Sequence, residues 1–108
     1  MELKLSIFGH PYWLFVEKGY RKSSGNWGSH NGETLCIVVD GDSAETIQKE
    51  TLLHELGECI NFWYELGMTH QQITIFTKSL WNAFGSNPKM MEWLLKTMKE
   101  EKDAKLNG

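Results

Sequence analysis

Apolar residues in the first forty positions fall in short runs that predict β-strands. Residues 1–8 alternate polar and apolar side chains, the period of a strand that buries one face. Further apolar runs cover residues 12–16 and 34–39, and the second of these is rich in β-branched side chains. Between them, residues 17–33 are rich in Gly, Ser, Asn and Lys, which predicts a long loop. We therefore expect an N-terminal antiparallel sheet of about three strands.

The remaining apolar positions have helical spacing and predict three helices. The first is expected over residues 44–66, with Gly67 as its C-cap. A second helix starts at Thr69, where Gln72 three residues later completes a capping box. The third opens with Asn87 as N-cap, followed by Pro at the first helical position. The order of elements is that of a small α+β protein.

The length of the chain fits one domain. It has 108 residues, of which 41% are hydrophobic and 23% charged, a composition typical of globular proteins. We divide the domain into four segments: residues 1–42, the strands and the long loop; 43–67, the first helix, which carries the candidate metal ligands; 69–99, the two further helices; and 100–108, a tail expected to fray.

Charge and cysteine content exclude several classes of protein. The net charge of −3 gives no electrostatic footprint for nucleic acid. No run of 18 apolar residues is present, so no membrane span is expected. The N-terminus lacks the basic-then-apolar order of a signal peptide. The two cysteines, Cys36 and Cys59, are expected to be free thiols of a reducing compartment, which indicates a cytoplasmic protein. The charge and the lack of a membrane span together predict neither nucleic-acid nor membrane partners.

The first predicted helix carries a polar stripe with candidate metal ligands. At about 100° per residue, His54 and Glu58 are one turn apart and point the same way, so both can reach one cation. The opposite side of the helix is apolar and is expected to face the core, through Leu52, Leu56, Cys59, Ile60 and Trp63. A solvated polar face with an ordinary His–Glu pair is the alternative.

Glu55 lies about 100° around the helix from His54, beside the expected cation. A carboxylate in that place can take a proton from a water held by the metal, which is the role of a general base. Considered alone, Glu55 fits an exposed helix glutamate better than a base, and only its place beside His54 and Glu58 favours the general base.

A catalytic zinc site usually has three protein ligands and a water, so His54 and Glu58 need a third partner. His70, twelve residues after Glu58, is the candidate. Each helical residue carries the chain about 1.5 Å further, so a return is strained unless the first helix ends near Tyr64. An exposed histidine at a helix N-terminus is the alternative for His70. His10 and His30 are weaker candidates for ligands, and His30 is also placed to face a substrate.

The phrase His54-Glu55-Leu-Gly-Glu58, followed by eleven residues and His70, resembles a zincin. It is most similar to the short zincin-like metallopeptidases of bacteriophage genomes, and more distantly to the SprT-like and ImmA/IrrE-like families. The resemblance covers residues 33–84 and implies a zincin-like fold, Zn²⁺ as cofactor, the metal ligands His54, Glu58 and His70, and Glu55 as general base. The usual motif is His-Glu-x-x-His, and here Glu58 stands at the fifth position. With His70 as third ligand the set is still two His and one Glu, in a different order along the chain.

The resemblance implies a zinc-dependent hydrolase, a minimal metallopeptidase acting on a peptide or protein. The strand expected at Leu35–Asp40 is placed to align an extended peptide by strand addition. Three side chains are candidates to stabilise an oxyanion: Tyr20, Arg21 and Tyr64.

A binding protein is the alternative from another class. It would be a catalytically inactive zincin-like protein that keeps a structural metal, or none, and modulates a host protein. Exposed aromatic residues such as Trp27 or Trp81 would anchor that contact, although core packing is the commoner role for Trp81. The resemblance favours a bacteriophage origin, which implies that the protein acts in the host cytoplasm. The substrate and the oligomeric state are not predicted.

Overall fold

A computed structural model describes the backbone of residues 1–107 and the side chains of all but residues 97 and 100–107. The fold is α+β, with four strands and four helices in this part of the chain. The chain forms two compact units, residues 1–78 and 79–108, and each is described by itself.

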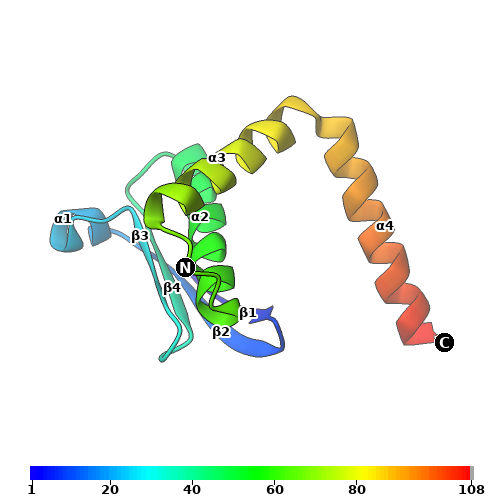
Figure 1. Cartoon of the computed structure of the whole chain (residues 1–108), viewed down its shortest axis with the longest axis horizontal. Coiled ribbons are helices and arrows are strands. Elements are labelled where there is room, and N and C mark those ends of the chain that lie inside the picture. Colours follow the sequence, from blue (N-terminus) through cyan, green and yellow to red (C-terminus); the bar gives the residue numbers. More distant parts are fainter. Residues whose placement is uncertain (108) are drawn as a thin grey trace. The chain divides into compact units, whose positions relative to one another are not determined.

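The first unit contains a sheet, a short helix between its second and third strands, and the helices that come after the last strand (Figure 1). Its elements are β1 (Glu2–Ile7), β2 (His10–Glu17), α1 (Tyr20–Ser24), β3 (Gly28–Asn31), β4 (Cys36–Asp40), α2 (Glu45–Tyr64) and the first half of α3 (His70–Ser86). The second unit contains the end of α3 and all of α4 (Pro88–Asn107).

The sheet has four strands in the order β1-β2-β4-β3. β1 pairs with β2 and β3 with β4 in antiparallel fashion, but β2 and β4 are parallel. The expected antiparallel sheet of about three strands is therefore confirmed for the β1–β2 pair, but it is wrong in the number of strands and in the direction of β4 relative to β2. The predicted loop at residues 17–33 contains α1 and β3, and this long connection lets β4 run parallel to β2.

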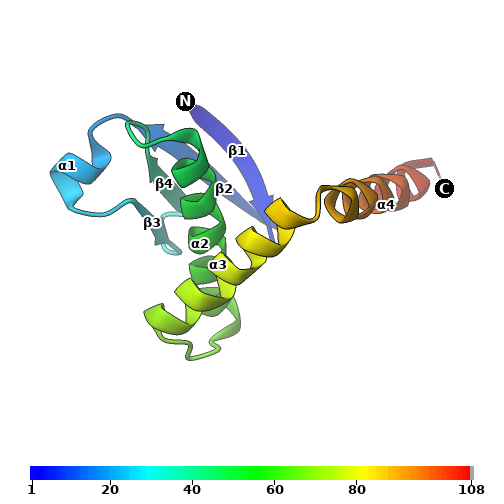
Figure 2. The same cartoon turned by 90° about the horizontal axis from the view of Figure 1, so that it is seen from above.

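The core of the first unit lies between the sheet and α2, which crosses one face of the sheet in both views (Figures 1 and 2). Inward side chains of β2 and β4 meet the apolar side of α2 in a cluster of Tyr12, Leu14, Ile37, Val39 and Cys59, packed against Leu52, Leu56 and Trp63. The predicted core face of α2 is thus confirmed except at Ile60, which is 39% exposed. Cys36 and Cys59 are both free thiols, as expected.

Tyr12 links the sheet to α2 through a buried polar contact. Its side chain is fully buried, and its hydroxyl accepts a hydrogen bond from Trp63 Nε1 at 2.7 Å. The same hydroxyl lies 2.8 Å from His30 Nε2. Burial raises the pKa of the Tyr12 hydroxyl to about 12, so it stays protonated and can donate to His30.

Tyr12→Phe is expected to lower the free energy of unfolding by about 1–3 kcal/mol, because it leaves the Trp63 N–H and the His30 nitrogen without their partner in the core. Urea denaturation measures the change. Tyr64→Phe is the control, since Tyr64 is 60% exposed, and it should change stability by less than about 0.5 kcal/mol. Equal effects of the two substitutions would contradict the prediction.

In the second unit, α4 begins as the sequence predicts. Pro88 is its first residue, and the Asn87 carbonyl accepts the hydrogen bond of Met91 N at 3.1 Å. The tail over residues 100–108 was expected to fray, but the described backbone is helical as far as Asn107; Gly108 lies outside the described residues. Among the described helices, none is long and apolar enough to cross a membrane.

Candidate metal centre

α2 presents the first two candidate ligands from successive turns. His54 Nε2 lies 3.4 Å from Glu58 Oε1, as the four-residue spacing predicts. The two side chains are about one-fifth and one-quarter exposed, so both are shielded by the surrounding elements without being closed off from solvent. Burial lowers the pKa of the His54 imidazole, against the opposing effect of Glu58. His54 is therefore neutral at pH 7, the form that binds metal.

The reversal after α2 brings the third candidate back. α2 ends at Tyr64, with Glu65 in the left-handed conformation (φ 49°), so the expected end at Leu66 with a Gly67 cap is wrong. The Asn61 side chain holds the turn: its Oδ1 accepts from Met68 N at 2.9 Å, and its Nδ2 donates to Met68 O at 3.4 Å. The helix thus ends where a return of His70 is free of strain.

The start of α3 fixes the position of His70. Gln72 N donates to Thr69 Oγ1 at 3.1 Å, and Thr69 N donates to Gln72 Oε1 at 2.8 Å, which confirms the predicted capping box. His70 is the first residue of α3. Its Nδ1 lies 3.1 Å from Glu58 Oε1, and its ring centroid is 4.9 Å from that of His54. The side chain is 78% exposed, so the cluster opens to solvent on this side.

Together these three side chains form a group with metal-ligand geometry. One donor atom from each of His54, Glu58 and His70 lies within 4.8 Å of the other two, and no other such group of three exists in the described part of the chain. Tetrahedral ligands about 2.05 Å from a zinc ion are about 3.3 Å apart. The two distances to Glu58, 3.4 and 3.1 Å, already match this spacing. The residues present therefore fit a zinc ion after a small closure between the two histidines.

Gly57 lets α3 come close to α2, a role that the sequence reasoning missed. A Cβ atom on Gly57 would lie 2.7 Å from Thr77 Cγ2 and 3.0 Å from Ile73 Cγ2. Ile73 and Thr77 are the buried residues of α3, so the first turns of α3 pack on the bare backbone of α2. A glycine within a predicted helix was the available signal, since Gly weakens a helix unless close packing requires it.

Gly57→Val is expected to weaken zinc binding by about tenfold or more and to destabilise the fold by about 1–3 kcal/mol, because overpacking moves α3 and His70 away from α2. Calorimetric zinc titration and thermal denaturation measure the two effects. Gly85→Ala in α3 is the control, because nothing lies within 4 Å of a Cβ atom there. Gly85→Ala should keep the wild-type zinc affinity, and its free energy of unfolding should rise by up to about 1 kcal/mol. Unchanged affinity in Gly57→Val would contradict the prediction.

Glu55 is the most buried charged group of the site. Its side chain is 6% exposed and lies between α2 and β3, and a Cβ atom on Gly28 would be 3.3 Å from its Cγ. In the described part of the chain, no hydrogen bond to its carboxyl is found. Burial raises the pKa of the Glu55 carboxyl to about 7, and the nearby Glu58 carboxylate adds to the increase. The group can therefore exchange a proton near neutral pH.

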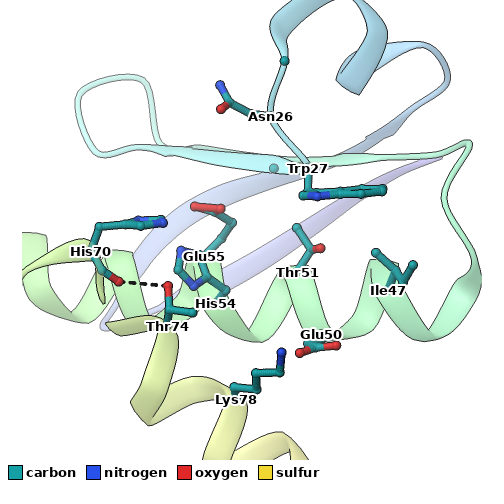
Figure 3. Close-up of a pocket in the computed structure, with 12 residues that line it drawn as sticks. Asn26, Trp27, Ile47, Glu50, Thr51, His54, Glu55, His70, Thr74 and Lys78 are labelled. Carbon is teal, nitrogen blue, oxygen red and sulfur yellow. Dashed lines mark hydrogen bonds between the residues drawn. The ribbon is translucent and has the colours of Figure 1, made fainter. Parts of the chain in front are cut away.

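The Glu55 carboxyl opens into a cavity of about 570 Å³ that also reaches His54 and His70 (Figure 3). The cavity lies between the segment that leads into β3 on one side and α2 with the start of α3 on the other. A water molecule at its metal end would have two of the candidate ligands, His54 and His70, and Glu55 as neighbours.

The other sequence candidates lie elsewhere. His30 is hydrogen-bonded to Tyr12, and His10 stacks on Trp63 with 3.9 Å between ring centroids, so neither joins the cluster. The three oxyanion candidates do not line the cavity: Tyr20 donates to Ser29, Arg21 stacks on Trp27, and Tyr64 packs against Phe8.

Comparison with known proteins adds no relative: no protein-family model matches the sequence, and neither a curated protein nor a solved structure matches it.

Proposed function

We propose that the chain is a zinc-dependent hydrolase, a minimal metallopeptidase of the zincin-like kind. The observation that carries the proposal is the convergence of His54, Glu58 and His70, with one donor atom of each within 4.8 Å of the others. Two imidazoles and one carboxylate are a ligand set of catalytic zinc sites. The resemblance of the motif to bacteriophage zincins supports the same assignment, and with it a place in the host cytoplasm.

Glu55 is the general base of the proposed reaction. When bound, the zinc ion would supply Lewis acidity and activate a water molecule. Glu55 accepts the proton of the attacking water, since its carboxyl opens into the cavity beside two of the ligands. A group that exchanges a proton near neutral pH can then pass it to the leaving amine.

The free edge of β3 is the place for an extended peptide. β4, the strand expected to align the peptide, lies between β2 and β3 and has no free edge, so that expectation is wrong. β3 is an edge strand, and Asp40 N donates to Trp27 O at 2.8 Å. Because bonded pairs alternate along an antiparallel ladder, the backbone groups of Gly28 and His30 point outwards. A peptide added there would lie next to Glu55.

Metal analysis tests the proposal. Protein purified without added metal or a His-tag is expected to contain about one zinc per chain by elemental analysis, because a site of three protein ligands retains zinc during purification. His54→Ala and His70→Ala should both lose it. His10→Ala, whose histidine lies outside the cluster, is the control and should keep it.

Zinc retained in His54→Ala or His70→Ala would contradict the three-ligand site. The proposal of a zinc hydrolase would be wrong if the wild-type protein takes up no zinc and its melting temperature is unchanged by chelator.

A binding protein is the second candidate, and exposed apolar side chains on α4 favour it. Four of them are more than one-third exposed: Met90, Trp93, Leu95 and Met98. Trp27 is also exposed, whereas Trp81 is half-buried. In such a protein the metal would stabilise the fold, and substitution of Glu55 would leave the function intact.

A further inference from the structure

The cavity extends beyond the metal cluster, and one wall of its far end is apolar. Trp27 and Ile47 line it there, and Figure 3 shows Ile47 and Thr51 pointing from α2 towards the indole ring. Trp27 is 42% exposed and Ile47 is 38% exposed. Large apolar side chains that line a concave site are typical of ligand pockets. Neither residue has a part in metal binding or proton transfer.

The indole ring of Trp27 is held in place from outside. The Arg21 guanidinium carbon lies 3.9 Å from the ring centroid, and Arg21 does not line the cavity. Such stacking stabilises the ring orientation and covers one of its faces. The other face is therefore presented to the cavity, ready to contact a second flat or branched apolar group.

Charges at this end of the cavity give no preference for an ion. Glu50 from α2 and Lys78 from α3 both line it, and they point towards one another in Figure 3. Since one carries each sign, a charged ligand group would meet attraction and repulsion together. An uncharged apolar group meets neither and covers the exposed faces of Trp27 and Ile47.

We infer that the far end of the cavity binds one bulky apolar side chain of a peptide, between Trp27 and Ile47. The inference rests on the proposed function, which supplies the peptide and the bond to be cut. Trp27 precedes Gly28 in the chain, and Gly28 lies against Glu55, so the subsite opens from the same cavity as the general base. The bound side chain therefore belongs to a residue near the scissile bond.

Binding is tested on the full chain without metal, so that the result does not depend on hydrolysis. N-acetyl-phenylalaninamide is titrated against N-acetyl-alaninamide, and the Trp27 indole N–H and the Thr51 amide are followed by NMR. The phenylalanine probe is expected to bind about tenfold or more tightly than the alanine probe, as burial of an aromatic side chain predicts. Its affinity should fall by a similar factor in Trp27→Ala.

Two further variants separate the cavity from a general effect on folding. Ile47→Glu, at a partly exposed position of α2, should also bind the phenylalanine probe about tenfold more weakly than the wild type. Trp13→Ala is the matched control, because Trp13 is also 42% exposed but lies on β2 away from the cavity, and it should bind like the wild type. Equal binding of the two probes, or unchanged binding in both cavity variants, would overturn the inference.

Cleavage mapping gives the second arm. With zinc-loaded protein and a mixture of casein peptides, cut bonds should be enriched in Phe, Leu and Met on one side, and Trp27→Ala should lose that enrichment. Cleavage without side-chain preference would overturn the inference about the cavity but would still support the proposed hydrolase. Selective binding of the phenylalanine probe without any cleavage would support the cavity site and count against the hydrolase.

Discussion

Glu55→Gln is expected to lower peptide hydrolysis by roughly 10²–10⁴-fold while zinc content stays at the wild-type level. The amide has nearly the shape of the carboxylic acid but cannot take a proton from the attacking water. Because Glu55 is outside the group of three ligands, its replacement leaves the donor atoms in place. Initial rates on the casein peptide mixture, measured beside elemental analysis of the same samples, test both halves of this expectation.

Glu50→Gln provides the control for the loss of a carboxylate. Glu50 lies on the same helix and lines the same cavity, one turn before His54, but it does not approach the cluster of ligands. Its replacement should change the rate by no more than a few-fold. If Glu55→Gln is as active as Glu50→Gln, Glu55 is not the base, and a structural metal in a binding protein becomes the better explanation of the cluster.

The polar face of α2 could be predicted because helix geometry is local. Residues four apart share a face in any α-helix, so the sequence alone placed His54 beside Glu58 and the apolar side opposite. The capping box at Thr69 is local in the same sense and is confirmed. The requirement that α2 end near Tyr64 followed from the rise per residue, and the structure meets it.

β3 could not be predicted, because no local pattern encodes it. Its sequence Gly-Ser-His-Asn has neither alternating apolar residues nor β-branched side chains. The strand is held by its antiparallel pairing with β4 and by contact with α2, both of which are tertiary. Gly28 permits that contact, since a Cβ atom there would lie 2.6 Å from Thr51 Cγ2. The strand that forms one side of the candidate site was therefore assigned to a loop.

The turn between α2 and α3 was missed for a related reason. Asn61 lies on the same side of α2 as His54, seven residues later, and its side chain binds the backbone of Met68. A side chain that satisfies backbone groups seven residues later belongs to no standard capping pattern. Gly57 is similar, because its meaning depends on which helix crosses it.

Glu55→Gln is also expected to change the stability of the metal-free protein. The substitution that lowers activity should raise the free energy of unfolding. In chelator, Glu55→Gln should be more stable than the wild type at pH 8, and the two should be equally stable near pH 4. The reason is that folding buries the carboxyl, which raises its pKa from 4.5 to about 7. Urea denaturation at several pH values between 4 and 8 measures the difference.

The sign follows from the protons bound in each state. Between pH 4.5 and 7 the folded protein holds a proton on Glu55 that the unfolded chain has lost, so the free energy of unfolding falls as the pH rises. A change in pKa of this size corresponds to at most about 3 kcal/mol, and partial hydration through the cavity reduces it. Gln carries no such proton, and its contribution is independent of pH.

Two other partly buried groups with shifted pKa values, His30 and His54, do not obscure this comparison. Burial lowers the pKa of both His30 and His54, so each contributes stability that is lost as the pH falls, the reverse of Glu55. Both are present in the wild type and in Glu55→Gln, so the difference between the two curves isolates the carboxyl. A difference that stays constant with pH would mean that Glu55 is ionised at no cost in the folded chain. A buried carboxyl that weakens the metal-free fold and opens into the cavity beside the ligands is what a catalytic base predicts, and a structural metal site gives no reason for it.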